Sequence, residues 1–131
     1  ATDYVDNLVA LRQAAAAGAD EALFADTAGM LCEGSGTNVF YVVDGELRTP
    51  PLATGCLPGV TRGLVLEWCD VREVEEPLEV LARASEVFLT SSTREVQPVA
   101  AVDGWTYVAP GPVTRTVLEE WGRRVAETTD P

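Results

Sequence analysis

Residues 32–40 read Cys32-Glu33-Gly34-Ser35-Gly36-Thr37-Asn38-Val39-Phe40. A single carboxylate, Glu33, ends an apolar stretch, and a glycine-rich turn then leads into a strongly strand-like run over 38–43. Asp44-Gly45 is a hairpin turn signal, after which residues 46–49 are predicted to return as the partner strand. This stretch therefore predicts an antiparallel hairpin with one carboxylate at its entrance.

Outward from this hairpin, the chain alternates between helix and strand signals. The helix predicted at residues 3–17 has Asp3 as its cap, an apolar face that includes Leu8 and Leu11, and Gly18 as its stop. The order α-β-β-β-β-α-β-α-β-β-β-α predicts an α+β domain with an antiparallel-rich mixed sheet and flanking helices. Further strands are expected at 21–26, 30–32, 71–75, 87–90, 96–102 and 105–108, and further helices at 60–69, 77–83 and 112–126.

Composition limits what the chain can do. Its 131 residues predict one domain over 1–131, and 47% hydrophobic residues are enough for a real core. The net charge of −12 argues against nucleic acid and anionic membranes as partners. Three cysteines without a close pair, and no histidine, predict neither a disulfide framework nor a metal site. We therefore expect a cytoplasmic location.

Two more segments have the chemistry of a phosphate site. Residues 57–62, Leu57-Pro58-Gly59-Val60-Thr61-Arg62, form a loop that enters a helix with a hydroxyl in its first turn. Residues 90–99 begin with Thr90-Ser91-Ser92-Thr93, a hydroxyl-rich loop after an apolar strand. Unpaired N–H groups and the helix dipole favour an anion at a helix N-terminus. Together with residues 32–40, these segments outline a site for a phosphate-bearing cofactor.

In their order and spacing these segments resemble the class IV aminotransferases, the fold-type-IV enzymes that use pyridoxal 5′-phosphate (PLP). The resemblance includes Glu-Gly-x-x-x-Asn at 33–38, Thr-Pro-Pro at 49–51, Gly-Val-Thr-Arg at 59–62 and Gly-Pro-Val-Thr at 111–114. It covers nearly all of the chain. It implies the large C-terminal domain of the D-amino-acid aminotransferase-like fold, PLP as cofactor, a small amino substrate and a homodimer.

The resemblance assigns the phosphate to two hydroxyl groups. Thr61 would give a hydroxyl and an N–H, and Val60 a second N–H. Ser92 aligns with the family's second hydroxyl ligand, and its neighbour Ser91 is a further candidate donor. The alternatives are an ordinary first-turn threonine and a serine-rich turn of the kind that is common in loops.

The resemblance also assigns residues around the cofactor ring. Glu33 would face the pyridine nitrogen, Leu57 would pack on the ring face, and Tyr4 would hydrogen-bond the phenolic oxygen. Their alternatives are an exposed turn glutamate, a loop residue packing on the core and an aromatic residue at a helix start. Arg94 could meet a substrate carboxylate or be a solvated arginine. Arg62 is expected to be structural.

The chain contains no lysine. In the family, the lysine that links the cofactor would fall just before Ala1, and a phosphate-binding arginine lies in an N-terminal domain. We therefore expect this chain to be the C-terminal, PLP-binding domain of a longer subunit.

Three functions stay open at this point. The lyase members release pyruvate from aminodeoxychorismate and leave 4-aminobenzoate for folate synthesis, and residues 55–62 and 91–97 look most like this group. The alternative is a branched-chain or D-amino-acid aminotransferase. A non-catalytic fragment or dimerisation core is the third.

Overall fold

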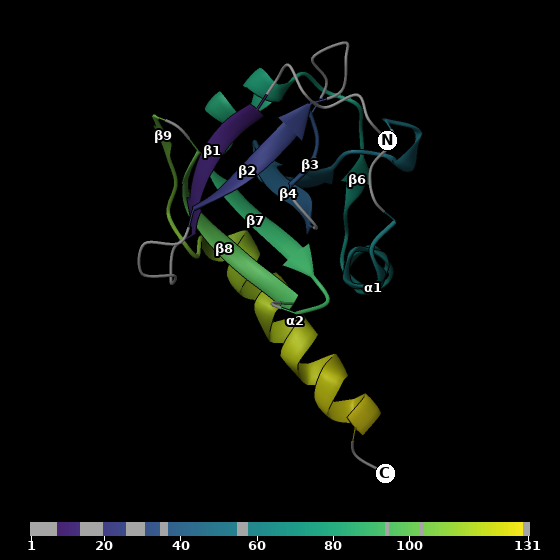
Figure 1. The fold of residues 1–131 in the computed structure, drawn as a ribbon. Coiled ribbons are helices and arrows are strands. Elements are labelled where there is room, and N and C mark those ends of the chain that lie inside the picture. The colour runs from purple at the N-terminus through teal and green to yellow at the C-terminus, as the bar shows by residue number, and fades with distance from the viewer. Residues whose placement is uncertain are drawn as a thin grey trace.

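The computed structural model describes residues 8–13, 20–25, 31–34, 37–54, 58–93, 95–102 and 104–129, with side chains from residue 37 onward. Its strands form one sheet in the order β3-β2-β1-β8-β7-β4-β5-β6, with β9 beside β8 (Figure 1). Because β3 also pairs with β4, six of these strands close into a ring. The strands are β1 (Leu8–Gln13), β2 (Asp20–Ala25), β3 (Leu31–Gly34), β4 (Thr37–Val43), β5 (Glu46–Thr49), β6 (Arg72–Glu73), β7 (Glu86–Ser91), β8 (Glu95–Val102) and β9 (Trp105–Thr106).

Two α-helices, α1 (Val60–Trp68) and α2 (Pro112–Thr129), pack on the outside of this ring. Pro112 occupies the first helical position of α2, where the missing N–H costs nothing. Val117 and Trp121, four residues apart, form the buried face of α2. The C-terminal end of α2 extends beyond the strands (Figure 1). Two short 3₁₀ helices, η1 (Leu52–Thr54) and η2 (Leu78–Ala82), complete the described elements.

Strand β4 divides the core because all seven of its residues are buried. Phe40 and Val42 face the helices, where the ring of Phe40 stacks on Phe88 at 4.9 Å. Val39 and Tyr41 belong to a second hydrophobic cluster, on the opposite face of β4 from the helices. Alternate residues of a strand point to opposite faces, so β4 is covered on both sides.

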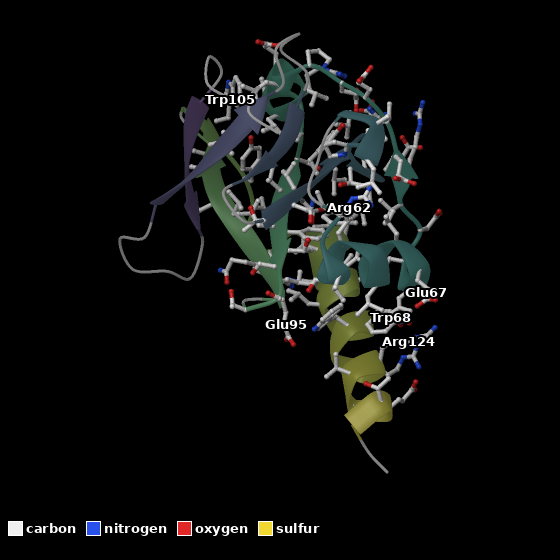
Figure 2. The ribbon with its side chains drawn as sticks, turned by 45° about the vertical axis from the view of Figure 1, so that its right-hand side comes forward. Arg62, Glu67, Trp68, Glu95, Trp105 and Arg124 are labelled. Atoms are coloured by element: carbon white, nitrogen blue, oxygen red, sulfur yellow. The ribbon has the colours of Figure 1, made fainter. Side chains whose placement is uncertain are left out.

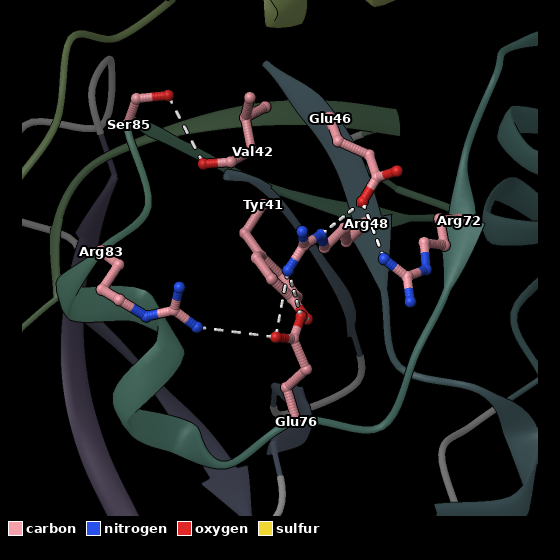
Figure 3. Close-up of polar contacts among 8 residues, drawn as sticks. All are labelled: Tyr41, Val42, Glu46, Arg48, Arg72, Glu76, Arg83 and Ser85. Carbon is pink, nitrogen blue, oxygen red and sulfur yellow. Dashed lines mark hydrogen bonds and ion pairs between the residues drawn. The ribbon is translucent and has the colours of Figure 1, made fainter. Parts of the chain in front are cut away.

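The hydroxyl of Tyr41 connects strand β4 to the segment that precedes η2. Its hydroxyl donates to Glu76 Oε1 at 2.5 Å, and Arg48 Nη1 donates to both Glu76 oxygens at 3.1 Å. Arg48 also binds Glu46, which accepts from Arg72 (Figure 3). Burial, reinforced by the hydrogen bond to Glu76, raises the pKa of Tyr41 above its usual range. The pair of charges with the phenol ties β4 and β5 to the loop at residue 76.

The buried carboxylate of Glu86 caps the N-terminus of α2. Glu86, 3% exposed, accepts hydrogen bonds from the backbone N–H groups of Val113 at 3.1 Å and Thr114 at 2.7 Å. Gly111 lies so close that a Cβ built there would be 2.3 Å from Glu86 Cδ. A side chain on residue 111 would therefore displace the carboxylate that caps α2.

The helix predicted at 3–17 is wrong where the structure describes it, because residues 8–13 form strand β1. This segment pairs with β2 over five residue pairs and with β8 on its other side. Pairing on both sides outweighs the helix propensity of an alanine-rich segment.

The other predicted elements are present with shifted ends. Residues 77–83, predicted as a short helix, form the 3₁₀ helix η2, and the strand expected at 105–108 is limited to Trp105–Thr106. The predicted α+β class with an antiparallel-rich sheet is confirmed: every described pairing except β5–β6 is antiparallel.

Candidate functional site

A pocket of about 230 Å³ lies at the N-terminus of α1. Its walls come from β4, the turn that enters α1, and the end of β7. Among the described residues that line it there is no Asp or Glu, and the one charged residue is an arginine. The lining residues are Asn38, Pro58, Gly59, Val60, Thr61, Arg62, Thr90, Ser91 and Ser92. The pocket is therefore rich in hydrogen-bond donors and suits an anion.

Helix α1 begins directly on the sheet. A Cβ built on Gly59 would be 2.5 Å from Asn38 Oδ1, so only glycine fits at this contact. Gly59 is the N-cap residue, and no side chain caps the helix. No acidic residue lies in the first turn either. The first N–H groups of a helix have no partner within it, so they remain suited to an anion from outside.

Thr61 joins α1 to the end of β7. Its hydroxyl donates to the backbone oxygen of Ser91 at 3.1 Å. Thr61 is 6% exposed, whereas Val60 beside it is 76% exposed. The contact brings the hydroxyl-rich loop at 91–93 against the first turn of the helix.

The side chain of Arg62 connects α1 to the segment after β5 and to β6. Its side chain is 4% exposed, and Nη2 donates to the backbone oxygen of Pro50 at 3.1 Å and to Glu73 Oε1 at 2.7 Å. Figure 2 shows this side chain between α1 and the strands. These partners lie in the chain after β5 and in β6, so Arg62 has the structural role expected from the sequence.

Strand register places the backbone of Glu33 in line with this pocket. Glu33 of β3 lies opposite Asn38 of β4, and Asn38 lies opposite Thr90 of β7. Neighbouring strands are about 4.8 Å apart, so Glu33 and Thr90 are separated by roughly 10 Å. A pyridine ring carrying a phosphate ester arm is of comparable size.

The sequence-predicted site residues therefore fall into three groups. Val60, Thr61, Ser91 and Ser92 line one pocket. Glu33 lies two strands from Thr90, with its backbone described. Tyr4, Leu57 and Arg94 lie outside the described residues.

Sequence reasoning did not place Asn38 and Thr90 in the pocket. Both lie in the segments that outlined the phosphate site, residues 32–40 and 90–99, but their proximity follows from the pairing of β4 with β7. The register of these two predicted strands is the signal that could have found them.

A second, larger groove of about 590 Å³ lies between the β4–β5 hairpin, the end of α1 and α2. Trp68 and Arg124 lie beside it, with the guanidinium 5.9 Å from the ring centroid (Figure 2). Burial, and then the charge of Glu120, raise the pKa of Cys69 in its wall. Three carboxylates, Glu46, Asp70 and Glu120, line this groove, so it is less suited to an anion than the smaller pocket.

Within the described part of the chain, no group of three acidic, cysteine or histidine side chains is arranged to hold a metal ion. Among its helices, none is both long and apolar enough to cross a membrane.

Comparison with known proteins identifies the family. The model of "Amino-transferase class IV" matches residues 1–102. The branched-chain-amino-acid aminotransferase of Pseudomonas aeruginosa is 35% identical over 134 residues, which cover 97% of this chain and 43% of that protein. The chain spans 37–44% of the length of the curated relatives that it matches first.

Solved structures agree with this match. The PLP form of the branched-chain amino acid aminotransferase from Thermobaculum terrenum superposes with a TM-score of 0.77 at 33% identity, over 82% of this chain and 38% of that one. A candidate 4-amino-4-deoxychorismate lyase from Legionella pneumophila gives a TM-score of 0.77 at 28% identity, over 81% and 41%. The chain belongs to the class IV aminotransferases, the family whose cofactor is pyridoxal 5′-phosphate.

Proposed function

We propose that this chain is the PLP-binding domain of a class IV enzyme, and that the pocket at α1 takes the cofactor's phosphate. The observation that carries the proposal is the donor-rich lining of this pocket, whose described residues include no carboxylate in a chain with a net charge of −12. The contact of Asn38 with Gly59 leaves the start of α1 no room for a side chain, which keeps the backbone N–H groups accessible.

The residues present fit the group. The hydroxyls of Thr61 and Ser92, with the N–H of Val60, would hold the phosphate, and Ser91 is a further candidate donor. The Thr61 hydroxyl donates its one proton to the backbone oxygen of Ser91 in this structure, so it would turn to the phosphate when the cofactor binds. Leu57 would pack on the ring, Tyr4 would bind its phenolic oxygen, and Arg94 would meet a substrate carboxylate.

Glu33 is proposed to face the pyridine nitrogen. When bound, PLP supplies the electron sink that stabilises a carbanion at the substrate's α-carbon. A carboxylate beside the ring nitrogen holds a proton there, because the ion pair favours the charged form of both groups. The position of Glu33, opposite Asn38 of the pocket lining and two strands from Thr90, supports this role.

We further propose that the intact subunit contains an N-terminal domain, with the lysine that this chain lacks, and that it forms a homodimer. The fraction of the relatives' length that the chain spans supports the first point. The cytoplasmic location expected from the sequence stays a prediction.

Four functions are consistent with this site, three of them reactions. Transfer of an amino group from a branched-chain amino acid is supported by the names of the relatives at 34–39% identity. The lyase reaction predicted from residues 55–62 and 91–97 is supported by the structural likeness to the Legionella protein. D-amino-acid transfer is a third possibility within the family, and a non-catalytic domain a fourth.

Substrate dependence distinguishes the reactions. The intact lyase, given aminodeoxychorismate alone, is expected to release pyruvate and 4-aminobenzoate continuously, because no second substrate is consumed. A transaminase given an amino acid alone stops after one turnover per active site and resumes when 2-oxoglutarate is added. Continuous assays of both products decide between them. Absence of every one of these activities in the intact, PLP-loaded protein would favour the non-catalytic domain.

Loss of either hydroxyl is expected to weaken cofactor binding. Thr61→Ala and Ser92→Ala in the intact subunit should each cost about 1.5–3 kcal/mol of PLP affinity, the value of a hydrogen bond to a charged group. Titration of the apoprotein with PLP measures this. Thr116→Ala is a suitable control, because this exposed hydroxyl binds only the backbone oxygen of Pro112 within α2. Unchanged affinity in both site variants would remove these residues from the site.

A further inference from the structure

Thr90 has a buried hydroxyl without a partner. The residue is 2% exposed, and its Oγ1 makes no hydrogen bond to any described atom. Buried polar groups are nearly always hydrogen-bonded, so one without a partner calls for an explanation, and a bound ion is one such explanation. The environment of Thr90 shows which kind of ligand this is.

Thr90 lies on the face of the sheet that looks toward α1. It is opposite Asn38, whose Oδ1 contacts the first turn of that helix at Gly59. Its side chain lines the same pocket as Thr61, one residue before the serine whose backbone oxygen Thr61 binds. The unpartnered hydroxyl is therefore part of the wall of the proposed phosphate pocket.

A second residue of this lining also has a buried donor without a partner. Arg62 lines the pocket, and its buried Nε has no hydrogen-bond partner among the described atoms, although Nη2 has two. A buried hydroxyl without an acceptor, in a pocket whose described lining includes no carboxylate, calls for an acceptor that enters from outside. An anionic oxygen supplies it.

We propose that Thr90 is a positioning residue of this pocket, whose hydroxyl donates a hydrogen bond to an oxygen of the bound phosphate group. The inference rests on the proposed function and adds to it a donor from strand β7, besides the hydroxyls of Thr61 and Ser92. Because Oγ1 itself is enclosed, the acceptor reaches it at the inner end of the pocket, or after a rotation about χ1 that exchanges the hydroxyl with the methyl group.

The test is the pair Thr90→Val and Thr90→Ser in the intact subunit. Valine keeps the shape and removes the hydroxyl. In the apoprotein this removes a buried group without a partner, so thermal stability should be unchanged or higher. Affinity for PLP should fall about tenfold. Inorganic phosphate should raise the thermal stability of the apoprotein less in this variant than in the natural protein. Affinity for pyridoxal, which has no phosphate, should not change, and Thr90→Ser should restore the affinity for PLP.

Thr37→Val is the matched control. Thr37 is 3% exposed and its hydroxyl is also buried without a partner, but it does not line the pocket. It precedes Asn38 in β4 and so points to the opposite face of the strand. Its valine variant should bind PLP, phosphate and pyridoxal as the natural protein does. If Thr90→Val does not fold, Thr90→Ala is judged by the same ratio of PLP to pyridoxal affinity.

Two outcomes would overturn the inference. One is an unchanged affinity of Thr90→Val for PLP and phosphate. The other is a loss of apoprotein stability in Thr90→Val that Thr90→Ser restores, because the hydroxyl would then have a partner within the protein. Parallel titration of Thr61→Ala separates this inference from the proposed function. If Thr61→Ala weakens PLP binding and Thr90→Val does not, only the role of Thr90 is wrong. If neither does, the pocket is not the phosphate site.

Discussion

Glu33→Gln is expected to leave PLP bound to the intact subunit and to lower its turnover by several orders of magnitude. Binding should persist because the groups proposed to hold the phosphate, on Val60, Thr61 and Ser92, are unchanged in this variant. Turnover should fall because a neutral amide cannot hold the proton on the ring nitrogen as a carboxylate does, and each tenfold loss corresponds to about 1.4 kcal/mol of barrier. Spectrophotometric titration measures binding, and steady-state assays measure turnover.

Glu67→Gln provides the control for this change. Glu67 is an exposed glutamate on α1, away from the pocket lining (Figure 2). The same loss of one negative charge there should leave turnover unchanged. Near-normal turnover of the Glu33 variant would show that this carboxylate is not the partner of the nitrogen.

Gly111→Ala is expected to be the most destabilising small substitution in the described domain. The added methyl group would lie 2.3 Å from Glu86 Cδ, so the carboxylate or the start of α2 has to move. The two hydrogen bonds from Val113 and Thr114 to this carboxylate would then be lost or distorted. Since each is worth about 1.5–3 kcal/mol, we expect a loss of roughly 3 kcal/mol or more in the free energy of unfolding, measured by urea denaturation.

A double-mutant cycle tests the cause. In a Glu86→Ala background the space is vacant and the hydrogen bonds are already gone, so adding Gly111→Ala should cost little more. Gly122→Ala is the control, because a Cβ there has nothing within 4 Å. In the middle of α2 this change should raise the free energy of unfolding by about 0.5–1 kcal/mol. Additive losses from Gly111→Ala and Glu86→Ala would mean that residue 111 acts through something other than the carboxylate.

Local chemistry was sufficient to predict the centre of the fold. The run that becomes β4 and the Asp44-Gly45 turn match a two-residue hairpin, and both turn residues have positive φ, 53° and 79°. The same reasoning failed at β1. The spacing of Leu8 and Leu11 among alanines fits a helix. The segment is a strand because it pairs with β2 and β8, and β8 lies far away in the sequence. Local propensity contains no information about such partners.

The candidate site divides in the same way. Thr61 and Ser92 are recognisable because a helix start and a hydroxyl loop are local features, and the pocket contains both. Thr90 reads as the last residue of an apolar strand, and only its register with Asn38 brings it under α1. Glu86 lies just before the strand predicted at 87–90, and its capping of α2 depends on packing across 27 residues.

The position of β1 between β2 and β8 also determines the order in which the domain can be completed. Leu11 pairs with Val102, so 91 residues (102 − 11) separate the two partners that close this side of the ring. As the chain leaves the ribosome, β1 to β4 can pair in sequence, but one edge of β1 stays open until β8 has been made. Pairings this distant are slow to form, and an open strand edge is a site of aggregation. We therefore expect ring closure at β1 to be the late, slow step of folding, and the nascent chain to depend most on chaperones in the interval before residue 102 emerges.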